Sequence, residues 1–189
     1  MILAVTFPHF GAGGRSALGI GFGIESVFYC FFWGMGTAVS ALVGRSLGEG
    51  RPERAEAVAH TAARFSLTLG VATGISFWVF GPTLVHVLAG SGQAAEANIE
   101  YLEMLAWAQP FQALQTIYDQ ALIGAGATLP AMIATSTMNI LRIPLAHALA
   151  VWAGWGLAGI WWAVNFSSVG KFVWTRLLFR RGRWKLKDV

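Results

Sequence analysis

The amino-acid sequence predicts an all-α integral membrane protein with five transmembrane helices, and three observations support this fold class. Of the 189 residues, 56% are hydrophobic and 12% are charged, whereas ordinary soluble domains carry roughly 25% charged residues. The apolar residues form five stretches, each long enough to cross a bilayer core, which takes about 20 helical residues. None of the stretches alternates polar with apolar residues as a transmembrane β-strand does, and in hydrocarbon a helix satisfies its own backbone hydrogen bonds.

We expect these five helices to form a single transmembrane unit. Ionisable side chains inside the spans are few: Glu25 in the first, Asp119 in the third, Arg142 in the fourth, and Lys171 and Arg176 in the fifth. The second span contains no Asp, Glu, Lys or Arg. The predicted spans cover residues 17–43, 65–89, 104–126, 129–151 and 157–179, and a basic tail follows at 180–189.

The positions of Lys and Arg outside the spans predict the orientation of the chain. The connection between the first two spans holds Arg45, Arg51 and Arg54, and the tail holds five further basic residues. The connections at 90–98 and 152–156 hold no Lys or Arg. With five crossings, both basic regions lie on the same side, which the positive-inside rule assigns to the cytoplasm. We therefore expect a multi-pass protein of the cell membrane with a cytoplasmic C-terminus.

Local signals refine this topology. Pro at the first helical position loses no needed N–H, so Arg51-Pro52 indicates a helix start. Amphipathic Trp rings prefer the membrane interfaces, which predicts Trp152 and Trp155 at the outer interface and Trp184 at the inner one. The small residues of Gly70-x-x-x-Gly74 and of 34–41 predict close helix packing.

Other features narrow the class of protein. The net charge of +4 comes from basic residues that flank the membrane, so we expect no nucleic-acid partner. Cys30 is the single cysteine, which excludes an intrachain disulfide framework. An odd number of helices that begins outside is what remains when a protein with an even number of helices loses its first part. The sequence therefore predicts a fragment whose partner, besides the lipid bilayer, is a missing N-terminal lobe.

Three groups of motifs, in this order along the chain, carry a family resemblance. The first comprises Gly-Ile-Glu-Ser at 23–26, the small residues of 34–41, and Val-Gly-Arg followed by Leu-Gly and Gly-Arg-Pro-Glu-Arg-Ala within 43–55. The second is Ala-Leu-Ile-Gly-Ala-Gly-Ala-Thr-Leu-Pro at 121–130. The third is Asn139 with Pro-Leu-Ala at 144–146, Gly-Leu-Ala-Gly-Ile-Trp at 156–161 and Arg-Gly-Arg-Trp-Lys at 181–185. The chain thereby resembles the C-terminal half, roughly helices 8 to 12 of 12, of MATE (multidrug and toxic compound extrusion) transporters.

The resemblance implies a secondary active antiporter, not an enzyme. Such a protein exports small organic cations and drugs in exchange for Na⁺ or H⁺ and needs no cofactor beyond this coupling ion. The present chain departs from the family pattern at Ala127, where the family usually has Asp. Because the N-terminal lobe is thought to carry much of the ion coupling in this family, the mechanism does not transfer intact to the five helices alone.

Glu25 is the first candidate site residue. It lies eight residues into its span, about 12 Å deep at 1.5 Å per residue, where an ionised carboxylate is costly unless it faces a cavity or a partner. One interpretation is a carboxylate that binds a cation or proton on the wall of a central cleft. The other is a structural Glu that is hydrogen-bonded between helices or lies near water.

The third span carries a polar face. Gln112 and Asp119 are seven residues apart and share a helix face, and Gln115 lies between them, as expected of a helix that lines an aqueous cleft. Asp119 has a second interpretation, as an interfacial residue that reaches water or caps a neighbouring helix. For Tyr118, stacking on a cationic ligand stands beside the favoured role in packing.

The remaining intramembrane polar residues are interpreted as structural. Arg142 and Lys171 predict an interhelical salt bridge or hydrogen bonds, and Asn139 predicts a hydrogen bond across helices. The four histidines lie far apart without metal-ligand spacing, so no metal site is expected.

Two alternatives to the antiporter stand at this stage. A flippase for lipid-linked oligosaccharides, from the same superfamily, would have a strongly cationic cleft, whereas the buried charges here are mixed. A membrane remnant that transports nothing, or a subunit that requires a partner lobe, is the other.

Overall fold

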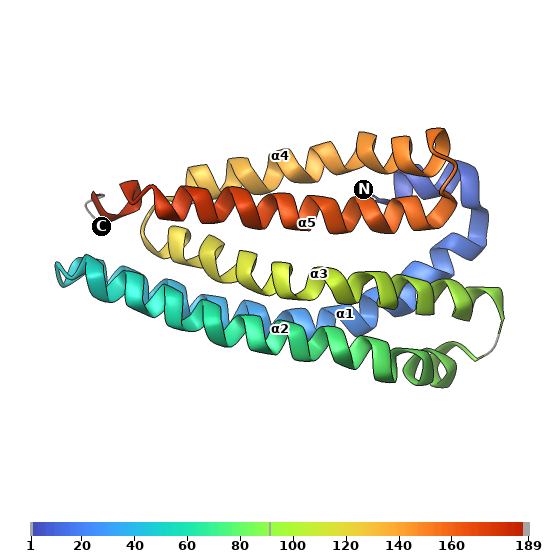
Figure 1. Cartoon of the computed structure of the whole chain (residues 1–189), viewed down its shortest axis with the longest axis horizontal. Helices are drawn as coiled ribbons and strands as arrows, with labels where there is room; N and C mark the ends of the chain where they lie inside the picture. Colours follow the sequence, from blue (N-terminus) through green and yellow to red (C-terminus); the bar gives the residue numbers. More distant parts are fainter. Residues whose placement is uncertain (1, 91, 187–189) are drawn as a thin grey trace.

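The protein folds as a bundle of five long helices that run along a common axis (Figure 1). The computed structural model describes residues 2–90 and 92–186, and this part of the chain contains no β-strand. The all-α prediction is confirmed. The elements are α1 (Ile2–Gly48), α2 (Pro52–Ala89), α3 (Gln93–Gly124), α4 (Thr128–His147), the π-helical turn η1 (Ala148–Trp152), α5 (Gly156–Arg180) and the 3₁₀ turn η2 (Arg183–Leu186).

Helix α3 lies in the middle of the bundle, with α1 and α2 on one side and α4 and α5 on the other (Figure 1). Two hydrophobic clusters hold these helices together. One includes Phe77, Leu102 and Trp161, and the other includes Val43, Ile117 and Phe179. Because each cluster draws residues from both sides of α3, this helix joins the two pairs into one body.

The helices extend beyond the predicted spans where polar sequence continues them. Helix α2 begins at Pro52 rather than near residue 65, and α3 begins at Gln93 rather than near 104. At 1.5 Å per residue, the 38 residues of α2 measure about 57 Å, well beyond a hydrocarbon core of about 30 Å. An apolar run marks the part of a helix that can lie in hydrocarbon. The helix itself continues through polar sequence for as long as the backbone keeps its helical hydrogen bonds. The Arg51-Pro52 start is confirmed, with Pro52 in the first turn.

The fourth helix also differs from its predicted span of 129–151. The α-helical hydrogen bonds of α4 stop at His147, three residues after Pro144, and the chain continues as the π-helical turn η1. Proline removes one helical N–H and crowds the preceding turn, and π-turns occur where the regular ladder is disturbed. Within the described residues, two helical stretches are long and apolar enough to cross a membrane, Gly19–Gly48 and Pro52–Leu88.

The two basic regions lie at the same end of the bundle, as predicted. The Lys185 Nζ of the tail lies 2.6 Å from Glu56 Oε2 in the first turns of α2. In the α1–α2 connection, the hydrogen bond from Arg45 holds the pKa of the Glu49 carboxyl below its usual value, and Arg54 and Arg51 add attraction. The Lys185–Glu56 contact places the start of α2, which follows the α1–α2 connection, beside the tail.

The expectation that Trp184 lies at a membrane interface needs correction. Its side chain is buried within the protein, stacked on Phe179 with ring centroids 4.7 Å apart. Its indole N–H donates to the Phe179 carbonyl oxygen at 2.7 Å. Trp184 therefore fixes the start of the tail to α5, while Trp152 and Trp155 at the other end are exposed.

Small residues let the helices approach closely, as predicted for Gly70 and Gly74. A Cβ added to Gly74 would lie 2.6 Å from the carbonyl oxygen of Ala106 in α3, and a Cβ on Gly70 would lie 2.9 Å from the Cα of Pro110. In the stretch 34–41, a Cβ on Gly36 would lie 2.8 Å from Gln120 Cγ, whereas Gly34 has nothing within 4 Å of such a Cβ. The predicted close packing is therefore confirmed at Gly36 and is wrong at Gly34.

We expect Gly74→Ala to destabilise the protein by about 1–3 kcal/mol, because overpacking forces two helix backbones apart. Gly34→Ala is the matched control, since it makes the same change in an open place. Thermal unfolding of the purified protein in detergent measures both. Equal unfolding temperatures for the two variants would contradict the close approach of α2 and α3.

Candidate functional site

A polar pocket of about 240 Å³ lies among α1, α3, α4 and α5. It contains two basic side chains, one carboxylate and several amides and hydroxyls, while α2 contributes nothing to its lining. Its residues are Phe22, Glu25, Tyr29, Tyr101, Gln112, Gln115, Thr135, Asn139, Arg142, Val164, Ser168 and Lys171. Six of the eight predicted site residues are thus brought together.

The polar pocket lies between the two hydrophobic clusters on three successive helices. On α3, Gln112 and Gln115 follow the cluster residues that end at Ala108 and precede those that begin at Ile117. On α4 the pocket residues lie between 131 and 146, and on α5 they lie between 164 and 179. The polar groups therefore occupy the middle level of the bundle, with apolar packing on either side of them along the helix axes.

Glu25 is held in this pocket by a residue that the sequence did not suggest. The Tyr101 hydroxyl donates to Glu25 Oε2 at 2.5 Å, and the Tyr101 ring is buried against Trp161 with centroids 4.8 Å apart. One turn earlier, the Gly21 N–H donates to Asn98 Oδ1 at 2.9 Å. Helix α3 thereby fixes both the level and the rotation of α1 at the carboxylate.

Asp119 lies beside the polar pocket and joins three helices. It accepts hydrogen bonds from Gln115 Nε2 (2.7 Å), Thr175 Oγ1 (2.9 Å) and Thr135 Oγ1 (3.3 Å). It lines a second pocket of about 350 Å³, here called the Asp119 pocket. Three residues, Tyr29, Gln115 and Thr135, line both pockets, so the two are neighbours along the helix axes.

The two basic residues differ in their partners. Arg142 Nε donates to Ser167 Oγ at 2.6 Å, which is a hydrogen bond from α4 to α5 of the kind predicted. Lys171 is 8% exposed, and among the described residues its ammonium group makes no hydrogen bond or ion pair. The expected interhelical salt bridge is therefore absent from the described part of the chain, and the charge of Lys171 faces the pocket.

Two further expectations differ from the structure. Asn139 lines the polar pocket, but its predicted hydrogen bond across helices is not found among the described residues. Tyr118 lines neither pocket and is buried at the α2–α5 side of α3. Its hydroxyl accepts a hydrogen bond from Arg176 Nη1 at 3.0 Å, and its ring packs on Phe179 with centroids 5.1 Å apart. The packing role of Tyr118 is the one that the structure supports.

Two polar pocket residues of α4 and α5, Thr135 and Ser168, were not among the predicted site residues, although helical spacing puts each on one face with residues that were. Thr135, Asn139 and Arg142 recur at a spacing of four and then three residues, which puts them on one helix face. Ser168, Lys171 and Thr175 repeat the same helical spacing on α5. Tyr101 carries no such signal, because an aromatic residue in a membrane helix is as often packing as function. Within the described residues, no group of three or more His, Cys, Asp or Glu side chains is placed to hold a metal ion.

Comparison with known proteins decides the family. The model of the MatE family matches residues 1–147. The chain belongs to the MATE family. Among curated MATE relatives, the probable multidrug resistance protein NorM of Thermotoga maritima is 28% identical over 171 residues, which is 90% of this chain and 37% of that protein. The probable multidrug resistance protein YpnP of Bacillus subtilis is 27% identical over 154 residues, or 79% of this chain and 34% of that protein.

Solved MATE structures share the fold of this chain. A crystal structure of a MATE protein in the bent conformation superposes with a TM-score of 0.89 and 24% identity, covering 97% of this chain and 41% of that one. An inward-facing multidrug resistance MATE family transporter superposes with a TM-score of 0.88 and 24% identity, covering 94% and 40%. This MATE chain therefore has the all-α fold of membrane transporters and spans less than half the length of these relatives.

We expect the lining of the polar pocket to be accessible to water. In a Cys30→Ala background, Gln115→Cys should react with a small charged methanethiosulfonate reagent, because Gln115 lines both pockets. The control is Tyr118→Cys, one turn away on a buried face, which should stay unmodified. Mass spectrometry of the labelled protein measures both reactions. Labelling of the Tyr118 variant with protection of the Gln115 variant would contradict the assignment of the pocket-lining face.

Proposed function

We propose that this chain is the C-terminal lobe of a secondary antiporter that exports small organic cations across the cell membrane in exchange for Na⁺ or H⁺. One observation carries the proposal: a carboxylate, Glu25, lines a polar pocket at the middle level of the bundle, between two hydrophobic clusters. Ionisable residues inside a membrane are costly and mark ion or substrate paths. Substrate and coupling-ion sites of secondary transporters lie near the bilayer midplane.

The formal charges of the two pockets suit an exchange of cations. Glu25 and Asp119 carry two negative charges, and Arg142 and Lys171 carry two positive ones, so the set is neutral when all four are ionised. Binding of H⁺ or Na⁺ to one carboxylate leaves a net positive charge, which disfavours a cationic substrate close by. Release of the coupling cation removes this net positive charge and frees a carboxylate for the cationic substrate. Exchange follows because both cations depend on the same carboxylates.

The hydrogen bonds of the carboxylates provide the link from binding to movement. Glu25 is bonded to α3 through Tyr101, and Asp119 is bonded to α4 and α5 through Thr135 and Thr175. A cation that takes up a carboxylate oxygen competes with these donors and so changes how the helices are held. A ligand shifts a conformational equilibrium by its differential affinity for the two states, and this competition supplies such a difference.

The family membership supports a second, N-terminal lobe as the partner, and the basic residues support a cell-membrane location with a cytoplasmic C-terminus. NorM of Thermotoga maritima and YpnP of Bacillus subtilis are probable multidrug resistance proteins, and this chain covers about a third of each. The order of the motifs at 19–55, 121–130 and 139–185 resembles that of the C-terminal half of the family and supports an N-terminal lobe as the proposed partner. The basic residues at the α1–α2 connection and the tail, together at one end, favour a cytoplasmic C-terminus.

We expect Glu25→Gln to abolish efflux of a cationic dye driven by an imposed Na⁺ or H⁺ gradient in proteoliposomes of the full-length protein. The amide keeps the shape of the side chain and the contact with Tyr101 but removes the charge that the exchanged cations share. Glu103→Gln is the matched control, because Glu103 is an exposed acid of α3 that lines neither pocket, and it should leave efflux within about twofold of wild type. Undiminished efflux by the Glu25 variant, with normal membrane insertion, would remove Glu25 from the mechanism.

A further inference from the structure

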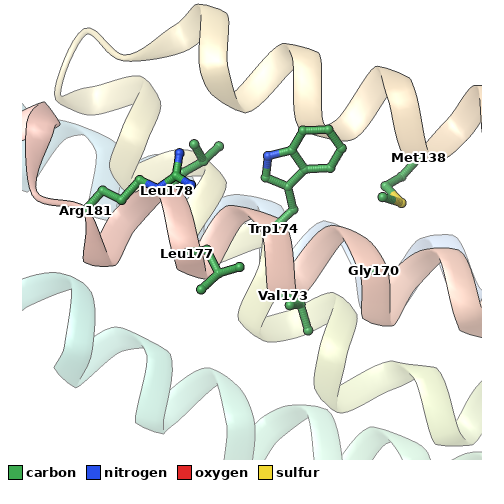
Figure 2. A pocket seen from close by; sticks show the side chains of 7 residues that line it. All are labelled: Met138, Gly170, Val173, Trp174, Leu177, Leu178 and Arg181. Carbon is green, nitrogen blue, oxygen red and sulfur yellow. The ribbon is translucent and has the colours of Figure 1, made fainter.

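A groove lies on the outside of the bundle, between α4 and α5 at the end where the tail begins. Its volume is about 470 Å³, and it is separate from both polar pockets. It is lined by Met138, Gly170, Val173, Trp174, Leu177, Leu178 and Arg181 (Figure 2). None of the predicted site residues borders it.

The groove has two chemically different ends. Arg181 lies at one end and Met138 towards the other, with the Trp174 indole between them (Figure 2). Arg181 is the sole charged residue of the lining, and the rest is apolar. Val173 and Leu177 on its edge are about half exposed, at 47% and 50%. This pattern matches a molecule with an anionic head and a long apolar chain.

The charge of Arg181 is unmatched by the described residues. At this end of the bundle, Glu49 is taken by three arginines and Glu56 by Lys185 and His60. No described carboxylate lies within ion-pair distance of Arg181, and Arg180 and Arg183 add two more positive charges nearby. The Arg181 guanidinium is exposed at the end of the groove, where an anion from outside the described chain can reach it.

Glycine shapes the floor of the groove. A Cβ on Gly170 would lie 3.0 Å from the Met138 sulfur, so the missing side chain leaves room beside the flexible tip of Met138. The furrow between α4 and α5 stays open, with Val173 and Leu177 exposed along its edge. An acyl chain fits such a furrow, because apolar side chains at its edge lose nothing by contact with hydrocarbon.

We propose that this groove binds one anionic phospholipid, with the phosphate at Arg181 and an acyl chain along Trp174 towards Met138. The planar guanidinium makes paired hydrogen bonds to phosphate oxygens. Basic clusters next to a membrane helix attract anionic lipid headgroups. The lipid site depends on membrane insertion and not on the transport reaction, so its test is independent of the proposed function.

The test compares two neighbouring arginines. The purified, delipidated protein in detergent is titrated with dioleoylphosphatidylglycerol, and bound lipid is counted by native mass spectrometry. Arg181→Gln should weaken the first binding event by about tenfold, the loss expected for a charge-assisted hydrogen-bonded contact. Arg180→Gln removes the same charge one residue away from the groove and should change the affinity by less than about twofold, as a screened surface charge does.

A second pair of variants tests the furrow itself. Val173→Trp fills the groove and should weaken the same binding event with Arg181 intact, whereas Leu141→Trp, at an exposed position of α4 outside the lining, should not. Dioleoylphosphatidylcholine should bind at least several-fold more weakly than phosphatidylglycerol, because it carries no net negative charge. Equal losses for Arg180→Gln and Arg181→Gln, or equal binding of the two lipids, would overturn the proposal and leave a non-specific lipid annulus.

Discussion

The cost of ionisable groups at the middle of a membrane bundle is the constraint on which the rest of this structure depends. Glu25, Asp119, Arg142 and Lys171 would each be costly in contact with lipid. The fold places Glu25, Arg142 and Lys171 between two hydrophobic clusters and Asp119 at the level of the second one. It gives Glu25, Asp119 and Arg142 hydrogen-bond donors or acceptors from other helices. The bundle is therefore organised around its polar level as much as around its apolar core.

The central position of α3 follows from this constraint. It supplies Tyr101 to Glu25, and it carries Asp119, to which Thr135 of α4 and Thr175 of α5 donate. On the opposite side, Gly70 and Gly74 let α2 approach α3 closely enough to exclude a side chain. Helix α2 thus packs on the side of α3 that faces away from the polar pocket, while α1, α4 and α5 line the pocket together with α3. A change at the carboxylates reaches three helices through direct contacts.

Much of the fold could be predicted from the sequence, since apolar runs of membrane length and the distribution of Arg report spans and topology directly. The bounds of the helices could not. Residues 93–103 contain Glu96, Glu100 and Glu103, which end an apolar run but are good helix formers, so α3 continues beyond it. Trp184 appeared to be an interfacial residue because an indole suits both an interface and a buried stack. Its contact with Phe179 depends on the turn at Gly182, which apolar patterning does not report.

The candidate site could be predicted in part. Glu25, Gln112 and Gln115 were found because polar groups are rare in such spans, and helical spacing put the two glutamines on one face. The rotation of each helix against its neighbours decides the remainder. It turns Tyr118 away from the pocket, leaves Asn139 without the expected partner among the described residues, and brings Tyr101 to Glu25. These outcomes depend on side-chain packing between helices. Tyr101 and Glu25, for example, are 76 residues apart in the sequence, so no local sequence pattern reports their contact.

If one set of carboxylates holds both exchanged cations, as we propose, the organic cation and the coupling cation compete for the protein at equilibrium. Binding of a fluorescent organic cation to the purified full-length protein would be measured while Na⁺ is raised at constant ionic strength, and separately while the pH is lowered. The account predicts that at least one of these cations displaces the dye, and that Glu25→Gln with Asp119→Asn weakens dye binding and removes the competition. Dye affinity that is unchanged by Na⁺ and by pH in the wild-type protein would contradict it.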